Sequence, residues 1–365
     1  MSYKIYLLIF PFLFVWMGCD VFENEQASIF ECTETDLSNA VLHAGVNKNP
    51  FSDSHIAAYN PETLELLYRT EIPLGAPLDI FYSQNDHFFY SIGVNSEASA
   101  IMHRSVQDGA FIDSIPAPES NYVRLNDSTF VTQIFGFGFM VINGKVKREG
   151  FSDHIIQAVQ EVNGEFYAIY GDIDNVYFGK VDTTGMTLVK DLSNLIQSTI
   201  RNGVAYSLQY NPDKKQLLVM MENVPQSPNS VLFDIDLSTD EFTATAAGQN
   251  GRIIASNDPR YFLITHRSSF SLNQKAAKHL FAYDKLAKKL IRIINFDKEF
   301  GMQAYVQDIS TNGCNIFAGL LLVDSELNQS AAIFNYDMKT GEIRNKITFK
   351  DFFSITTLDL SLNNY

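Results

Sequence analysis

Short apolar runs, separated by turns of Asp, Asn, Gly and Pro, follow one another along the chain from about residue 37 to its end. The runs are rich in Phe, Tyr, Val and Ile, a composition that favours half-buried strands over helices. One kind of hairpin recurs, in which an apolar strand ends in an acidic or amide residue and a second strand follows a short turn. Its seven copies span residues 55–70, 99–115, 137–150, 175–190, 231–246, 280–294 and 331–347.

A second kind of hairpin lies between these copies, with Asn, Asp, Gly or Pro at its turn and aromatic or β-branched residues on both sides. Six copies are continuous in the sequence, at residues 79–94, 121–135, 155–171, 205–221, 252–266 and 305–323. A seventh copy can be assembled from the two ends of the repeat region. Residues 354–362 would supply its first strand and residues 38–46 its second.

Four strands recurring every 40–50 residues or so are typical of the blades of a β-propeller. The pattern therefore predicts an all-β fold, a seven-bladed β-propeller over residues 37–365 that closes by exchange of its N- and C-terminal strands. Closure in this way leaves no open sheet edge in the ring. The turn spacing varies from roughly 36 to 55 residues, so six or eight blades remain alternatives.

The first eighteen residues have a different pattern from the repeats. Lys4 gives a short positive start, residues 5–17 form an apolar run, and the small residue Gly18 ends the segment. The apolar run is short for a transmembrane helix, so the pattern predicts a secretory signal peptide over residues 1–18. Residues 19–36 are acidic and lack periodicity, which is typical of a flexible tether.

The junction Gly18–Cys19 resembles the lipobox of bacterial lipoproteins, in which the cysteine is acylated and becomes the new N-terminus. Trp16 departs from that family, which prefers Leu at this position. The resemblance implies that Cys19 carries the lipid. It also implies an anchor in the bacterial outer membrane, at the cell surface or on the periplasmic face.

Two repeats carry a further resemblance. YNPDKKQLLV (210–219) is similar to a strand turn of TolB-type propellers, with Lys214 in place of the usual Gly. YDMKTGEI (336–343) is similar to a hairpin common in quinoprotein-like propellers. With the lipobox, the chain resembles β-propeller lipoproteins of the Bacteroidota type. Some members sit beside outer-membrane transporters and capture nutrients, so the resemblance implies a transporter or a glycan as partner.

Charge and cysteine content narrow the function classes further. The net charge of −15 argues against nucleic acid as a partner, because phosphate binding needs a basic surface. Cys32 and Cys314 are the two cysteines that remain besides Cys19, in a chain expected to reach an oxidising compartment. The blade register puts both on the same rim in neighbouring blades, so they form a disulfide or remain two free thiols.

The candidate ligand site lies at the mouth of the predicted central channel. His154 and His266 fall in loops on the face where propellers usually bind ligands, and Arg201 and Arg252 map to the same side. We expect these four side chains to line one depression. No catalytic motif accompanies them, and we predict neither a metal ion nor a cofactor; GDIDN (171–175) lacks the length and the later Glu of an EF-hand loop.

The sequence thus favours a membrane-anchored, extracytoplasmic propeller that binds a ligand or a protein and assists nutrient or glycan uptake. The alternative is a glycan-active enzyme of the polysaccharide lyase type, in which a His, an Arg and a Tyr catalyse base-assisted β-elimination on a uronate. A scaffolding subunit without a small ligand is a third reading. Enzyme activity stays open, and fold alone does not decide it.

Overall fold

The computed structural model describes the chain in segments, and every structural statement below concerns these segments. They are residues 32–48, 54–72, 75–82, 87–93, 100–116, 122–126, 129–132, 140–142, 145–147, 155–172, 175–193, 205–211, 216–222, 231–239, 241–246, 252–254, 261–265, 279–284, 287, 289–350 and 354–361. The proposed signal peptide and Cys19 lie outside them. Within the described residues, no helix is long and apolar enough to cross a membrane.

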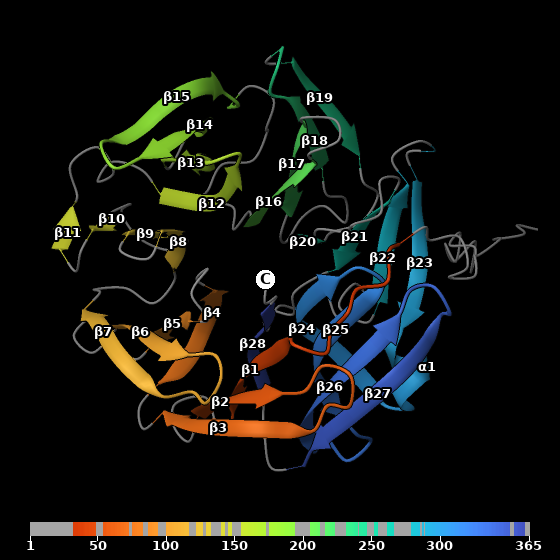
Figure 1. Cartoon of the computed structure of the whole chain (residues 1–365). Coiled ribbons are helices and arrows are strands. Elements are labelled where there is room, and N and C mark those ends of the chain that lie inside the picture. Colours follow the sequence, from red (N-terminus) through yellow and green to blue (C-terminus); the bar gives the residue numbers. More distant parts are fainter. Residues whose placement is uncertain are drawn as a thin grey trace, which may run out of the picture.

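In this part of the chain the strands form seven four-stranded antiparallel sheets, arranged around a common axis (Figure 1). We number the sheets along the chain. Sheet 1 contains β28 (Ser354–Ser361), β1 (Val41–Asn47), β2 (Ser54–Tyr59) and β3 (Leu66–Ile72). Sheet 2 contains β4 (Ala76–Tyr82), β5 (His87–Gly93), β6 (Ala100–Ser105) and β7 (Phe111–Pro116). Sheet 3 contains β8 (Tyr122–Asn126), β9 (Thr129–Thr132), β10 (Met140–Ile142) and β11 (Lys145–Lys147).

The other four sheets each take four consecutive strands. Sheet 4 contains β12 (Ile155–Val162), β13 (Glu165–Gly171), β14 (Val176–Asp182) and β15 (Gly185–Asp191). Sheet 5 contains β16 (Ala205–Asn211), β17 (Gln216–Glu222), β18 (Val231–Asp236) and β19 (Glu241–Ala246). Sheet 6 contains β20 (Arg252–Ile254), β21 (Tyr261–Thr265), β22 (His279–Asp284) and β23 (Lys289–Asn295). A short helix, α1 (Phe296–Phe300), leads to sheet 7, which contains β24 (Gln303–Asn312), β25 (Asn315–Val323), β26 (Gln329–Asp337) and β27 (Glu342–Phe349).

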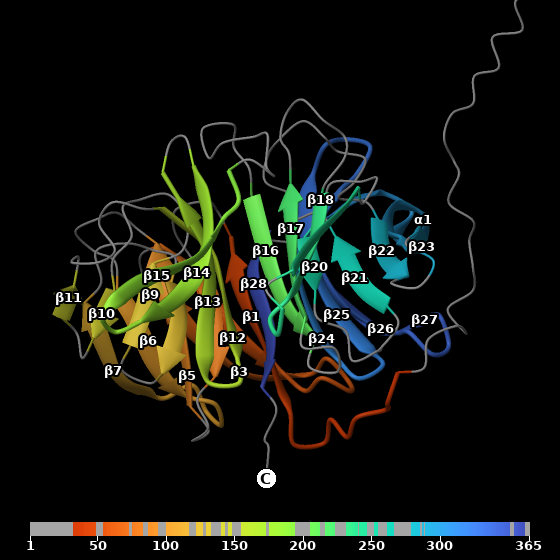
Figure 2. The ribbon, with the colours of Figure 1, turned by 90° about the horizontal axis from the view of Figure 1, so that it is seen from above.

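The first strand of each sheet lies nearest the axis and the fourth lies at the rim (Figure 1). We call the face where the inner strands begin the upper face and the face where they end the lower face. The upper face is at the top of Figure 2, in which β28 runs downward. The turns between first and second strands, and between third and fourth strands, therefore lie on the lower face.

In five of the seven sheets, the acidic or amide residue at the end of the third strand has a local structural role. Its side-chain oxygen accepts a hydrogen bond from a backbone N–H two or three residues later, which closes the turn into the fourth strand. The donor–acceptor pairs are Glu62 N to Asn60 at 2.8 Å, Thr184 N to Asp182 at 2.6 Å, Ser238 N to Asp236 at 2.8 Å, Ala287 N to Asp284 at 2.9 Å and Lys339 N to Asp337 at 2.8 Å. Because the turn needs a side-chain oxygen at this position, an acidic or amide residue recurs there, and the repeat can be recognised in the sequence.

Burial changes from the middle strands of a sheet to its rim. In sheet 7, eight of the nine residues of β25 are buried, because its sheet packs between neighbouring sheets on both faces. The rim strand β27 instead alternates exposed and half-buried side chains along its length. The core is therefore a series of apolar layers between neighbouring sheets, such as the cluster that joins sheets 6 and 7 around Phe334.

The C-terminal strand β28 is held from two sides. It pairs with β1 over seven Cα positions, with one bulge at Gly45/Val46. On its other side, side chains of β24 bind its backbone: Asp308 Oδ2 accepts from Leu358 N at 2.8 Å, and Gln307 Oε1 accepts from Ile355 N at 2.6 Å. The last strand of the chain thus links sheet 7 to the strands at the start of the repeat region.

Candidate functional site

The predicted mouth site is only partly covered by the structure. His154, Arg201 and His266 lie outside the described residues. Arg252 is the first residue of β20, and its Cα pairs with that of Thr265 on β21. Its side chain also lies outside the described part of the molecule, so the convergence of the four side chains stays a prediction.

The strand ends next to these positions do share one face. Ile155, Ala205 and Arg252 begin the inner strands β12, β16 and β20 of three consecutive sheets. All three strands start at the upper face, around the axis (Figure 2). A ligand site that contains these residues would therefore lie at the upper mouth.

Cys32 and Cys314 are joined by a disulfide bond, with their Cα atoms 5.1 Å apart. Cys314 lies in the lower turn between β24 and β25, and its backbone N–H donates to the carbonyl oxygen of Thr33 at 3.1 Å. Gly313 allows this close approach, because a Cβ atom there would collide with the Thr33 carbonyl. The tether predicted to run to residue 36 is therefore already held against sheet 7 at Cys32.

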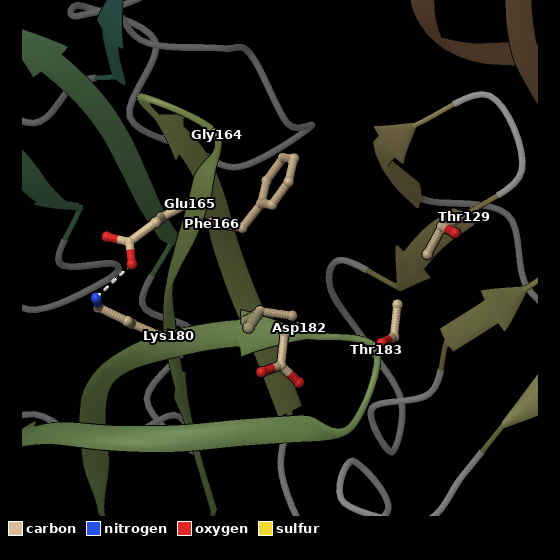
Figure 3. A pocket seen from close by; sticks show the side chains of 8 residues that line it. Thr129, Gly164, Glu165, Phe166, Lys180, Asp182 and Thr183 are labelled. Carbon is tan, nitrogen blue, oxygen red and sulfur yellow. Dashed lines mark hydrogen bonds and ion pairs between the residues drawn. The ribbon is translucent and has the colours of Figure 1, made fainter.

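A pocket of about 300 Å³ opens on the lower face, between sheets 3 and 4 (Figure 3). Its lining residues come from two lower turns of sheet 4 and from the start of β9: Thr129, Gly164, Glu165, Phe166, Lys180, Val181, Asp182 and Thr183. The volume is at the lower end of the range for small-molecule sites.

Local sequence explains the shape of this pocket. Asn163 and Gly164 both have positive φ, at 53° and 82°, and make the tight two-residue turn that an Asn-Gly pair favours between strands. No atom lies within 4 Å of a Cβ built at Gly164, so the turn leaves open space at the pocket. Phe166 points across the gap toward Thr129 of sheet 3 (Figure 3), and Thr129 is buried.

Two of the three charged groups that line the pocket form an ion pair, and Asp182 adds a further carboxylate. The Lys180 ammonium lies 2.7 Å from Glu165 Oε1, and the Tyr167 hydroxyl donates to Glu165 Oε2 at 3.0 Å. The hydrogen bond from Lys180 is the main cause that lowers the pKa of Glu165, and the same bond raises the pKa of Lys180. The pocket therefore offers hydroxyls, one aromatic ring, an ion pair and the Asp182 carboxylate, a set suited to a small polar molecule that donates hydrogen bonds.

This pocket was not predicted from the sequence. The Asn-Gly turn was visible within residues 155–171, and Asp182 was visible as the end of a third strand. The pocket itself forms only where these turns meet Thr129 of sheet 3. A local sequence pattern does not predict this contact between two sheets.

Asp172 and Asn175, which belong to the polar segment 171–175, bind each other. Asp172 Oδ1 accepts from the backbone N–H of Asn175 at 2.8 Å and from its Nδ2 at 3.0 Å, as in an Asx-type turn. Among the described residues, no group of three His, Cys, Asp or Glu side chains is placed to hold a metal ion.

A buried polar cluster surrounds His43 at the contact between sheets 1 and 2. The side chain of His43 is fully buried, with Nδ1 3.0 Å from the hydroxyl of Tyr82 and Nε2 2.5 Å from the hydroxyl of Tyr68. Burial lowers the pKa of His43 to about 3. A ring buried to this degree is inaccessible to a ligand, and we assign the cluster a structural role.

The fold is that of a β-propeller, since four-stranded antiparallel sheets surround one axis with their first strands innermost. This confirms the fold class predicted from the repeats. No family model and no curated protein matches the sequence. Two solved structures are similar to the chain. One is a chain from a nidogen/laminin complex, at 10% identity over 90% of this chain and 100% of that chain, with a TM-score of 0.48. The other is the C-terminal WD40 domain of Sif2, at 13% identity over 77% of this chain and 90% of that domain, with a TM-score of 0.45.

Proposed function

We propose that the protein is a lipid-anchored, extracytoplasmic binding module. Cys19 carries the lipid, and residues 37–365 form a seven-bladed propeller in which the pairing of β28 with β1 closes the ring. The upper mouth, with His154, Arg201, Arg252 and His266, receives a ligand or a partner protein. An anionic glycan or an outer-membrane transporter fits that mouth, whose four named residues are basic.

The disulfide between Cys32 and Cys314 is the observation that carries this proposal. Such bonds persist in oxidising compartments and are rare in the cytosol. This one lies shortly after an apolar segment that ends in Gly18–Cys19. The signal, the lipobox-like junction and the disulfide all favour the same extracytoplasmic address. A binding role agrees with the propeller fold, which displays loops from many sheets around one mouth.

Replacing the lipid-bearing residue tests the address. We expect Cys19→Ala to abolish fatty-acid labelling and to release the protein from the membrane fraction, because one missing thiol removes the acylation site. Cys32→Ser is the control, since it removes a cysteine without touching the junction, and it should keep its label. Labelling of the Cys19→Ala protein at the level of the unaltered chain would refute the anchor.

A uronate oligosaccharide tests the mouth. We expect Arg201→Ala to weaken binding of this anionic probe about 5- to 150-fold, the loss of a charge-assisted hydrogen bond of about 1–3 kcal/mol. Lys190→Ala, on the rim strand β15, should leave binding unchanged. Equal affinity of both variants would contradict the mouth site. Formation of an unsaturated sugar product by the unaltered protein would support the lyase alternative instead.

A further inference from the structure

The segment that leads into the propeller is fixed on the lower face. We name residues 32–37 the N-terminal strap. Figure 2 shows the strap in red on the lower side of the ring, the side toward which β28 also runs. Given the lipid anchor proposed at Cys19, we infer that the strap orients the molecule, with its lower face toward the membrane. The upper mouth is then the surface open to a macromolecular partner.

Several independent contacts hold the strap. The Cys32–Cys314 disulfide fixes its first residue, and the hydrogen bond from Cys314 N to Thr33 O fixes the next. Glu34 Oε1 lies 2.8 Å from Lys339 Nζ in the lower turn between β26 and β27. At its far end, Leu37 is buried in the layer between sheets 7 and 1. The fixed part of the chain therefore begins at Cys32, at the lower rim of sheet 7.

The length of the tether predicted between Cys19 and Cys32 favours one orientation. Twelve residues separate Cys19 from Cys32. A flexible chain of this length has a mean end-to-end distance of about 20 Å. Fully extended it spans about 45 Å. The ring is about 30 Å thick from face to face, the length of the nine-residue β26. An inverted molecule would hold the strap at least this far from the membrane, beyond the mean reach of the tether, so the tether would have to stay stretched.

The two candidate sites then face different surroundings. The pocket between sheets 3 and 4 opens on the lower face, in the narrow space beside the membrane, where a small molecule can diffuse but a folded partner has little room. The upper mouth faces away from the lipid, so a protein domain or a long glycan can approach it without displacing the anchor.

Energy transfer to the lipid surface can measure this orientation. Two reporter cysteines in sheet 7 carry the donor dye: Ser325→Cys, in the upper turn before β26, and Thr340→Cys, in the lower turn after it. Both positions are exposed, and the nine residues of β26 separate them by about 30 Å. The full lipidated chain is bound to phosphatidylcholine vesicles that contain acceptor-labelled headgroups. We expect transfer from Thr340→Cys to exceed transfer from Ser325→Cys severalfold.

A strap-release variant shows whether the strap is the cause. Cys32→Ser with Cys314→Ser leaves one backbone hydrogen bond and an exposed ion pair, each worth about 1 kcal/mol or less. The free chain then extends to Leu37 and reaches about 60 Å. We expect the two reporters to become nearly equal in this variant while vesicle binding persists.

The outcomes separate this inference from the anchor itself. If the chain does not bind vesicles, or binds them equally well after Cys19→Ala, the lipid has no role and the proposed function fails. A chain that binds through Cys19 but shows equal transfer from both reporters, or more from Ser325→Cys, overturns the orientation alone. A difference that survives strap release overturns the role of the strap.

Discussion

Deletion of residues 354–365 is expected to abolish the cooperative folding of the propeller. The deletion removes β28, the innermost strand of sheet 1, and leaves the inner edge of β1 without its ladder partner. It also removes the buried side chains of Ile355, Leu358 and Leu360. Burying each contributes about 1.5–3 kcal/mol. Their sum is comparable with the whole stability of a typical domain, about 5–15 kcal/mol.

The loss of stability extends to sheet 7, because side chains of its inner strand β24 bind β28. Asp308 and Gln307 would lose the backbone N–H groups that they bind, and the Ser310 hydroxyl would lose Asp359, to which it donates at 2.8 Å. Ser310 is buried, and a buried polar group left without a partner costs about 1–3 kcal/mol. Circular dichroism during thermal unfolding measures the effect, and a truncated chain with an unchanged melting temperature would show that β28 does not close the ring.

A matched pair of point substitutions tests the same contact without truncation. Leu358→Ala removes a side chain that is 2% exposed, and we expect a loss of about 2–5 kcal/mol in the free energy of unfolding. Leu188→Ala makes the same chemical change at a rim position that is 54% exposed, and should cost little. Equal destabilisation by the two substitutions would mean that the packing of β28 adds nothing to stability beyond that of a rim strand.

Much of the fold was predictable because its signals are local. Asp337 or Asp182 at the end of a strand predicts the turn that follows, because the carboxylate binds N–H groups only two or three residues away. Repetition of that signal at a similar spacing is what predicts a propeller. Residues 354–362 and 38–46 were each a single strand without the second strand of a hairpin, so we predicted that they pair. In the structure β28 and β1 do pair.

The contacts between sheets were not predictable, because each depends on how one sheet packs on the next. The pocket brings Thr129 against the turns of sheet 4, and the cluster around His43 joins Tyr68 and Tyr82 from two sheets. In the sequence His43 is one histidine within an apolar strand, with no sign of its partners. The cysteine pair is an intermediate case: the register placed both on one rim, but only the structure shows the strap that carries Cys32.

Hydrogen-bond counting leaves two charge states for the His43 cluster, and burial decides between them. The hydroxyls of Tyr68 and Tyr82 lie within bonding distance of backbone carbonyls, those of Val106 at 2.8 Å and Asp359 at 2.9 Å. If both hydroxyls donate to these carbonyls, both ring nitrogens must donate, and the ring must be a cation. Burial opposes the cation, so the ring is neutral and one tyrosine donates to it instead.

This neutral, buried histidine makes the protein lose stability in mild acid. An unfolded histidine has a pKa near 6.5, whereas the pKa of His43 in the folded chain is about 3. Above pH 6.5 the ring is neutral in both states and contributes no pH dependence. Between these values the unfolded state binds one more proton, so the free energy of unfolding falls by about 1.4 kcal/mol per pH unit. His55, whose pKa burial lowers to about 4, acts in the same direction.

Urea unfolding between pH 7.5 and 5.5 measures this linkage, in a window above the range in which unfolded carboxylates, with pKa values of about 4, titrate. From pH 7.5 to 5.5 His43 alone should account for a loss of about 1.4 kcal/mol. His43→Gln is expected to be less stable at neutral pH. The slope of its free energy of unfolding against pH should be smaller, by the contribution of one bound proton. Tyr82→Phe keeps the ring and should keep the slope. A slope unchanged in His43→Gln would mean that the ring already binds its proton in the folded protein, and the neutral cluster would have to be replaced by a buried imidazolium that donates to both tyrosines.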